Sequence, residues 1–169
     1  MRKVSYMEKI LKNREIKKIG VSCIITEKTF TKFIMQRKDK QYPVPQFVNC
    51  ITFFGGGVEY GEAPEVAIKR EIKEEILLDE LQKIIISQLQ YFGTIYTKFK
   101  HQVYCYYVLL DDFIYFEKII LQYKQKSMLD KLCSEGVIET LTSNSLENET
   151  FAWNTDKVLE LYRKNSRNI

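Results

Sequence analysis

The chain has 169 residues and a net charge of +4. Because 45% of its residues are hydrophobic and 28% charged, a disordered chain is excluded and a globular domain with its own core is favoured. The modest positive charge can attract polyphosphates but is too diffuse to indicate nucleic acid by itself, and the four cysteines lack the CxxC spacing of a zinc site. No segment reads as a signal peptide or a membrane span, so we expect a single domain over residues 1–169 in the cytoplasm.

The first predicted elements are two strands joined as a hairpin. Residues 18–26 and 30–36 are rich in β-prone residues, while residues 5–16 ahead of them are mixed and charged, as in a short helix or an arm. A loop with two prolines follows at residues 41–46. Residues 47–54 are then predicted to form a strand that leads into a glycine-rich loop.

This loop is followed by a predicted helix. The loop contains glycines that allow unusual backbone angles and a close approach to a ligand: Gly55, Gly56, Gly57 and Gly61. Pro64 suits the first turn of a helix, and Glu62 and Glu65 place negative charge near its N-terminus, so we expect the helix to run from Pro64 or Glu65 to Ile76. One side of this helix carries aliphatic residues that can pack on a sheet: Val66, Ile68, Ile72 and Ile76.

The other side of the same helix carries three carboxylates. Glu71, Glu74 and Glu75 are spaced i, i+3 and i+4, which places them on one face. Such carboxylates repel one another unless a cation lies among them, and oxygen ligands suit magnesium or manganese. The alternative is a solvated helix whose acids pair with its own basic residues, Lys69, Arg70 and Lys73.

The second half of the chain is predicted to contain two more strands, at residues 84–91 and 103–110. Residues 113–132 have a strand-like start and a lysine-rich, helix-like continuation, and residues 155–164 form an amphipathic helix with Thr155 as a candidate N-cap. Strands on both sides of one central helix predict an α/β fold with a mixed sheet between helices.

Residues 56–78 resemble the box that defines the Nudix (MutT-like) hydrolases. Except for a glycine position filled by Leu77, its single-residue positions are met at fixed spacing, and its aliphatic positions are filled: Gly56, Glu62, Arg70, Glu71, Ile72, Glu74, Glu75 and Leu78. The resemblance implies an α/β/α sandwich with a mixed β-sheet. It also implies a Mg²⁺-dependent hydrolase, with Mn²⁺ as an alternative ion, that cleaves the diphosphate of a nucleoside diphosphate linked to another group X.

The resemblance also implies roles for individual residues. Glu74 and Glu75 would be metal ligands, Glu71 a ligand or the base that activates water, and Arg70 would orient a glutamate through a charge-assisted hydrogen bond. The carbonyl of Gly55 or Gly56 would complete the metal shell. The catalytic candidates are thus Glu71, Glu74 and Arg70, and the metal-ligating candidates are Glu71, Glu74, Glu75 and Gly56.

The box departs from the family pattern at Leu77, where the family has a glycine that ends the helix with positive φ. We expect a different helix end here. Since Leu77 continues an apolar stripe into residues 78–81, we also expect its side chain to be buried.

Outside the box, Arg37 and Tyr96 are candidates for substrate binding. Arg37 follows a strand near the expected substrate mouth, and Nudix hydrolases of diadenosine polyphosphates tend to have a base-stacking tyrosine near the position of Tyr96. The lone histidine, His101, is a packing residue or a phosphate contact. Many relatives add a downstream carboxylate, for which the candidates are Glu135, Glu139, Glu147 and Glu149.

Two other functions remain open at this stage. One is a non-catalytic module that senses a nucleotide, and the other an RNA 5′-end pyrophosphohydrolase, which would need clustered basic residues near the site. Candidates for such a cluster are Lys12, Lys17, Lys18, Lys38, Lys40, Lys98 and Lys100. The sequence identifies neither X nor the oligomeric state, and a homodimer is compatible with it.

Overall fold

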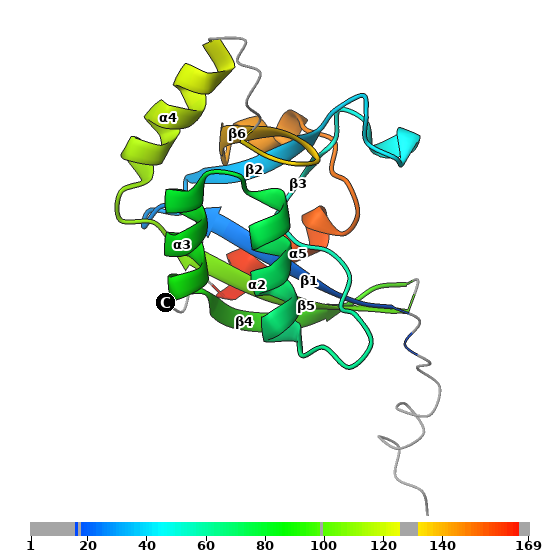
Figure 1. The fold of residues 1–169 in the computed structure, drawn as a ribbon. Helices are drawn as coiled ribbons and strands as arrows, with labels where there is room; N and C mark the ends of the chain where they lie inside the picture. Colours follow the sequence, from blue (N-terminus) through cyan, green and yellow to red (C-terminus); the bar gives the residue numbers. More distant parts are fainter. Residues whose placement is uncertain (1–15, 17, 99, 126–131, 166–169) are drawn as a thin grey trace, which may run out of the picture.

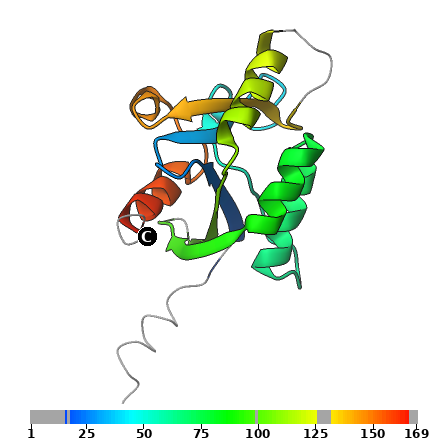
Figure 2. The same ribbon diagram turned by 90° about the vertical axis from the view of Figure 1, so that its left-hand side faces the viewer.

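The computed structural model describes residues 16, 18–98, 100–125 and 132–165, so nearly all of the segment expected as a helix or arm, at residues 5–16, lies outside the described residues. Within the described part, a mixed sheet is flanked by α2 and α3 on one face and by α5 on the other (Figures 1 and 2). The predicted α/β/α sandwich is therefore confirmed. No helix in the described residues is long and apolar enough to cross a membrane.

The elements follow one another along the chain as strands, helices and short 3₁₀ turns. The strands are β1 (Lys18–Thr26), β2 (Lys32–Lys38), β3 (Ile51–Thr52), β4 (Gln90–Tyr96), β5 (His101–Leu109) and β6 (Gly136–Thr142). The helices are α2 (Pro64–Glu75), α3 (Asp79–Gln88), α4 (Phe113–Gln125) and α5 (Thr155–Asn165), with 3₁₀ turns η1 (Pro45–Phe47) and η2 (Ser145–Asn148).

The sheet has the order β3-β2-β1-β5-β4, and β6 pairs with β2 outside this path. The central pair, β1 and β5, is parallel from Lys18↔His101 to Thr26↔Leu109, whereas the other pairs are antiparallel. At its start β1 pairs with the glycine loop instead of β2. The Val21 amide donates to the Gly56 carbonyl at 2.9 Å, and the Val58 amide donates to the Ile19 carbonyl at 3.0 Å. The loop is thus held at the centre of the sheet.

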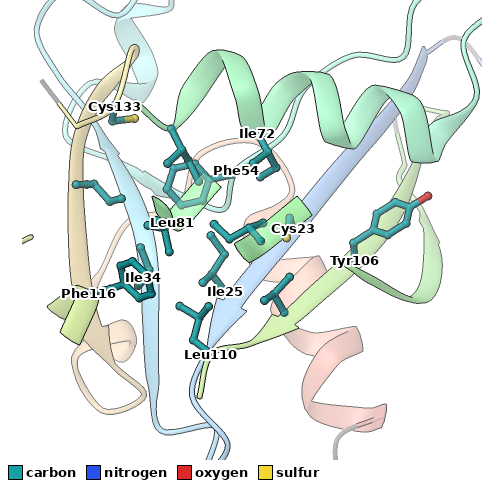
Figure 3. Packing of buried hydrophobic residues seen from close by; sticks show 14 of the residues in the cluster. Cys23, Ile25, Ile34, Phe54, Ile72, Leu81, Tyr106, Leu110, Phe116 and Cys133 are labelled. Atoms are coloured by element: carbon teal, nitrogen blue, oxygen red, sulfur yellow. The ribbon is translucent and has the colours of Figure 1, made fainter. Parts of the chain in front are cut away.

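The strands alternate their side chains between two cores, as a sheet covered on both faces requires. Cys23 and Ile25 of β1 face α2, α3 and α4, whereas Ile24 faces α5. Figure 3 shows the first core, where Ile72 of α2 and Leu81 of α3 lie over Ile25 and Ile34 of the sheet. The second core contains side chains of α5: Val158, Leu159 and Tyr162. These two cores fix α2 and the start of α5 relative to the sheet.

Several sequence-based boundaries were wrong. Most of residues 84–91 belong to α3, because Leu81 and Ile85 are buried at helical i, i+4 spacing despite the β-branched run. The strand expected at 47–54 is reduced to β3, while β6 was not predicted. Residues 113–125 form the helix α4, which resolves the ambiguity there; positions 126–131 lie outside the described residues.

The packing side of α2 also differs by one position from the prediction. Val66 is exposed, and Ala67 is buried in its place together with Ile68, Ile72 and Ile76. The helix α5 begins at Thr155 as expected. The Thr155 hydroxyl donates to the Ala152 carbonyl at 2.8 Å, whereas the first helical amide bond, from Val158, goes to the Asn154 carbonyl. Thr155 is therefore a buried first-turn residue and not the N-cap.

The end of α2 explains how the chain manages without the family glycine. The helix stops at Glu75, and Ile76 is extended, with φ −97° and ψ 113°. This short segment bridges to the chain ahead of β6, since the Leu77 amide donates to the Leu132 carbonyl and the Ser134 amide donates to the Glu75 carbonyl. In an extended segment side chains alternate, so Ile76 is buried and Leu77 is 49% exposed. The altered helix end is confirmed, but the burial expected for Leu77 is wrong.

Candidate active site

A pocket of about 440 Å³ opens between the glycine loop, the start of β1 and the start of α5. Its lining brings together residues that are far apart in the sequence: the loop glycines 55–57, Glu71, Glu75, Lys38, Glu135, Tyr42, Trp153 and Asn154. Carboxylates thus line one part of the pocket, and aromatic side chains line another.

The glycine loop is compressed between β1 and α2. Gly55 has φ 138°, and a Cβ atom there would lie 2.2 Å from the Val21 carbonyl oxygen. A Cβ atom on Gly56 would lie 2.6 Å from the Glu71 carboxylate. Any side chain at either position would push the loop away from the sheet or displace Glu71. These glycines are required because the backbone approaches the carboxylates so closely.

Arg70 gathers the carboxylates of the box. Its Nε and Nη2 atoms donate to the two oxygens of Glu62, both at 3.0 Å, in a bidentate pair. Its Nη1 atom donates to Glu71 at 2.8 Å and to Glu74 at 3.2 Å, and Nη2 also donates to the Gly57 carbonyl at 2.8 Å. The basic residue of the helix itself therefore neutralises part of the acidic face, as the solvated-helix alternative expected, and it also fixes the orientation of Glu71.

Glu75 is the buried carboxylate of the site, with 4% of its surface exposed. Its Oε2 atom accepts a hydrogen bond from the Gly55 amide at 2.7 Å, and its Oε1 atom lies 3.7 Å from the Lys38 Nζ atom. Burial is the main cause that raises the pKa of the Glu75 carboxyl to about 8, against the lowering effect of Lys38 and the Gly55 amide. Burial likewise raises the pKa of Glu71, although Arg70 opposes that shift.

Lys38 completes the acidic part of the pocket. Its buried ammonium donates to Glu135 Oε2 at 2.6 Å and lies 4.4 Å from the centre of the Tyr42 ring. Glu135 adds negative charge near both Glu71 and Glu75, since it contributes to raising the pKa of each. Of the downstream carboxylates considered from the sequence, Glu135 is the one in the pocket lining.

The donor set fits a hard divalent cation. It consists of carboxylate oxygens beside a backbone carbonyl at Gly56, which has spare acceptor capacity after receiving the Val21 amide. Among the described residues, the side chains as they lie form no group of three acids, histidines or cysteines close enough to hold a metal. The reason is local: Arg70 draws Glu71 and Glu74 to itself, while Glu75 turns to Gly55 and Lys38. Nudix hydrolases generally use divalent metal ions, and the residues present are of the right type to bind one.

The two substrate-binding candidates from the sequence do not line this pocket. Arg37 pairs with Glu149 at 2.7 Å and with Glu139 at 3.0 Å, and it joins β2 to β6 and to the chain ahead of α5. Tyr96 is exposed at the end of β4, whereas His101 does line the pocket, beside Lys18. Glu147 lies in η2, outside the lining.

Sequence reasoning missed Tyr42, Trp153 and Asn154, and it considered Lys38 only as part of a basic cluster for RNA. The side of β2 on which Lys38 lies could have been predicted, because side chains alternate along a strand. Lys38 shares its side with the core residue Ile34, whereas Arg37 points to the opposite side. Of the lysines considered for RNA binding, Lys18 and Lys38 line the pocket, whereas Lys12 and Lys17 lie outside the described residues.

Comparison with known proteins agrees with this geometry. The NUDIX domain family model matches residues 16–122, which is more than half of the chain. No curated protein matches the sequence. A Deinococcus radiodurans protein superposes with a TM-score of 0.61 at 17% identity, over 88% of this chain and 85% of its own.

Two further structures have the same fold. A MutT structure from a study of Aliivibrio salmonicida and Vibrio cholerae has a TM-score of 0.55 at 18% identity, over 87% of this chain and 98% of its own. The Nudix domain of Shewanella oneidensis NrtR, solved with ADP-ribose, has a TM-score of 0.57 at 12% identity, over 96% of this chain and 99% of its own. At these identities the structures support the fold alone, whereas the family match, together with a box that departs from the pattern at Leu77, identifies the chain: it belongs to the Nudix family, as one of its pyrophosphohydrolases.

Proposed function

We propose that this pyrophosphohydrolase cleaves the diphosphate linkage of a nucleoside diphosphate bound to another group X, with Mg²⁺ as its cofactor and Mn²⁺ as an alternative. The observation that carries the proposal is the convergence of Glu71, Glu75 and the glycine loop in one pocket, with Arg70 holding Glu71 and the Gly55 amide holding Glu75. The ADP-ribose bound to the Nudix domain of NrtR supports a nucleotide as the ligand class.

In this proposal Glu71, Glu74 and Glu75 hold the cation together with the Gly56 carbonyl. A bound divalent cation supplies charge neutralisation on the diphosphate and activation of water. Glu71 would accept the proton of the attacking water, a role supported by its low exposure of 13% and by the hydrogen bond that it accepts from Arg70. Arg70 in turn keeps its position through the bidentate pair with Glu62, so its role is to position the carboxylates.

The loop gives the substrate a route to these groups. Gly55, Gly56 and Gly57 line the pocket without side chains, so a diphosphate can lie against backbone beside Glu71. Because the pocket encloses about 440 Å³, it falls within the size range of small-molecule sites and suits one nucleotide unit.

A substrate panel tests the proposal directly. Nucleotide sugars, dinucleoside polyphosphates, NADH, coenzyme A and nucleoside triphosphates are incubated with Mg²⁺, with Mn²⁺ and with excess EDTA. We expect cleavage of at least one nucleoside diphosphate derivative with a divalent ion and none in EDTA. Turnover that persists in EDTA would contradict the proposed chemistry.

The control variant is Glu65→Gln, on an exposed part of α2 where Glu65 pairs with Lys69 at 2.6 Å. It should retain the wild-type rate. The same panel separates the two alternatives. A non-catalytic nucleotide sensor would bind nucleotides without cleaving any substrate, and an RNA 5′-end enzyme would prefer triphosphorylated RNA to every small molecule.

A further inference from the structure

Trp153 is the only tryptophan of the chain, and its backbone is unusual. It has φ 55°, in the left-handed region that residues other than glycine and asparagine seldom adopt. Its side chain is 54% exposed, although tryptophan is usually largely buried. A strained backbone that presents a large apolar ring to solvent is a feature found at functional sites.

The Trp153 ring is held in place on two sides. It packs against Phe47 with ring centres 4.7 Å apart, and its Nε1 atom donates a hydrogen bond to the Tyr42 hydroxyl at 3.1 Å. The ring is therefore exposed but fixed. A fixed aromatic surface loses little conformational entropy when a planar ligand stacks on it.

The aromatic group lies in the same pocket as the carboxylates. Tyr42 and Trp153 line the cavity that Glu71 and Glu75 also line. Lys38 connects the two parts, since its Nζ atom lies 4.4 Å from the centre of the Tyr42 ring and 3.7 Å from Glu75. A ligand with a phosphate end and an aromatic end can thus contact both parts at once.

The neighbouring Asn154 adds a polar group to the same wall. Asn154 follows Trp153 directly and also lines the pocket. A side-chain amide offers both donors and an acceptor, which matches the mixed polar edge of a heterocyclic base.

We propose that Trp153, supported by Phe47 and Tyr42, is the surface on which the nucleobase of the substrate stacks, with Asn154 contacting the edge of the base. This inference rests on the proposed function for the placement of the diphosphate at the carboxylates. It assigns base recognition to the chain around the start of α5 and to the loop after β2, and not to Tyr96.

Because Trp153 is the only tryptophan, its fluorescence reports on this site without any hydrolysis. The protein in EDTA is titrated with AMP, GMP, CMP and UMP, and separately with ribose 5-phosphate and inorganic pyrophosphate. We expect saturable quenching by at least one nucleoside monophosphate and none by the two probes that lack a base. Equal quenching by ribose 5-phosphate, or no quenching by all four nucleotides, would overturn the inference.

Variants give a second readout. Trp153→Asn suits the left-handed backbone, as Asn49 does elsewhere in this chain with φ 66°, so the fold should persist. We expect KM for the best substrate to rise about 10-fold or more, as loss of one base stack implies, while kcat stays within about 2-fold. Trp153→Phe should recover most of the loss. The control is Tyr91→Ala, which removes an aromatic ring of similar exposure, 55%, outside the pocket lining.

The outcomes separate this inference from the proposed function. If the wild type hydrolyses a substrate but Trp153→Asn has unchanged KM, the stacking role is wrong and the enzyme assignment stands. If nucleotides quench Trp153 but nothing in the substrate panel is cleaved, the stacking site stands and the proposed hydrolysis falls. A folded Trp153→Phe variant that binds no better than Trp153→Asn would also contradict stacking.

Discussion

Replacing Glu75 by glutamine should stabilise the metal-free protein at neutral pH, even though it removes a proposed metal ligand. Burial raises the pKa of the Glu75 carboxyl from its ordinary value of 4.5 to about 8. Because the folded-state pKa lies above that of the unfolded chain, this group leaves stability unchanged below pH 4.5 and lowers it as the pH rises toward 8. Glutamine has no charge to bury, so it avoids this loss.

The size of this stabilisation follows from the pH interval between the two pKa values, 4.5 and about 8. Each pH unit within this interval lowers the free energy of unfolding by about 1.4 kcal/mol. At pH 7 the ionisable carboxyl therefore lowers it by on the order of 3 kcal/mol. The opposing effects of Lys38 and the Gly55 amide are already contained in the pKa of about 8, and glutamine keeps an oxygen that can accept the Gly55 amide. The gain is therefore on the order of 3 kcal/mol at pH 7, or a melting temperature about 6–12 °C higher for a chain of this size.

Thermal unfolding followed by circular dichroism in EDTA at several pH values between 5 and 8 measures this difference. The advantage of Glu75→Gln should be close to zero at pH 5 and grow with pH. The control Glu65→Gln, on the same helix but exposed, should show a small difference that does not change across this range. A Glu75→Gln variant that melts below the wild type at pH 8, or a difference that is constant with pH, would refute the reasoning. Saturating Mg²⁺ should favour the wild type again, since only it keeps the full ligand set.

Three further predictions concern single residues of the box. Glu74→Gln should lower kcat by about 10²-fold while the melting temperature holds, because Glu74 is exposed; a near-normal rate with a large drop in melting temperature would show a structural role instead. Arg70→Lys loses the bidentate pair with Glu62 and should lower kcat by about 10-fold or more with little change in KM. A wild-type kcat in a steady-state assay would contradict the positioning role of Arg70. Leu77→Gly should cost only about 1 kcal/mol in denaturant unfolding, since Leu77 is half-exposed in an extended segment, and a loss of 2 kcal/mol or more would mean that its side chain is buried after all.

The box and its helix could be predicted because their determinants are local. Pro64 sets the start of α2, the i, i+3 and i+4 spacing sets the acidic face, and the glycines set the close approach of the loop. The end of the helix could not be predicted in the same way. Leu77 is exposed because the chain ahead of β6, more than fifty residues later, pairs with Ile76 and turns it inward.

The residues on the substrate side of the pocket could not be predicted, because their positions depend on strand register and on contacts between distant segments. Arg37 and Lys38 are neighbours in sequence, yet their side chains lie on opposite faces of the sheet. Arg37 pairs with Glu139 and Glu149, whereas Lys38 lies near Glu75. Trp153 carries no sequence signal of its own, because its partners Phe47 and Tyr42 come from a loop over a hundred residues earlier. The backbone bridge between Ile51 and Phe151, together with the packing of α5 against the sheet, brings them together.

Two basic residues explain how one pocket can hold so many carboxyl groups in a folded chain. Two cations divide the acids between them: Arg70 takes Glu62, Glu71 and Glu74, and Lys38 takes Glu135 and lies near Glu75. Their positions with respect to an incoming metal differ. Arg70 is anchored by the Glu62 pair and the Gly57 carbonyl, so it can stay in place while Glu71 and Glu74 turn to a cation. Lys38 carries its charge into the site itself, beside the buried Glu75. Because the pKa of Glu75 is raised to about 8, metal binding at neutral pH would also have to release the proton of this carboxyl, beside an ammonium that Glu135 holds at 2.6 Å.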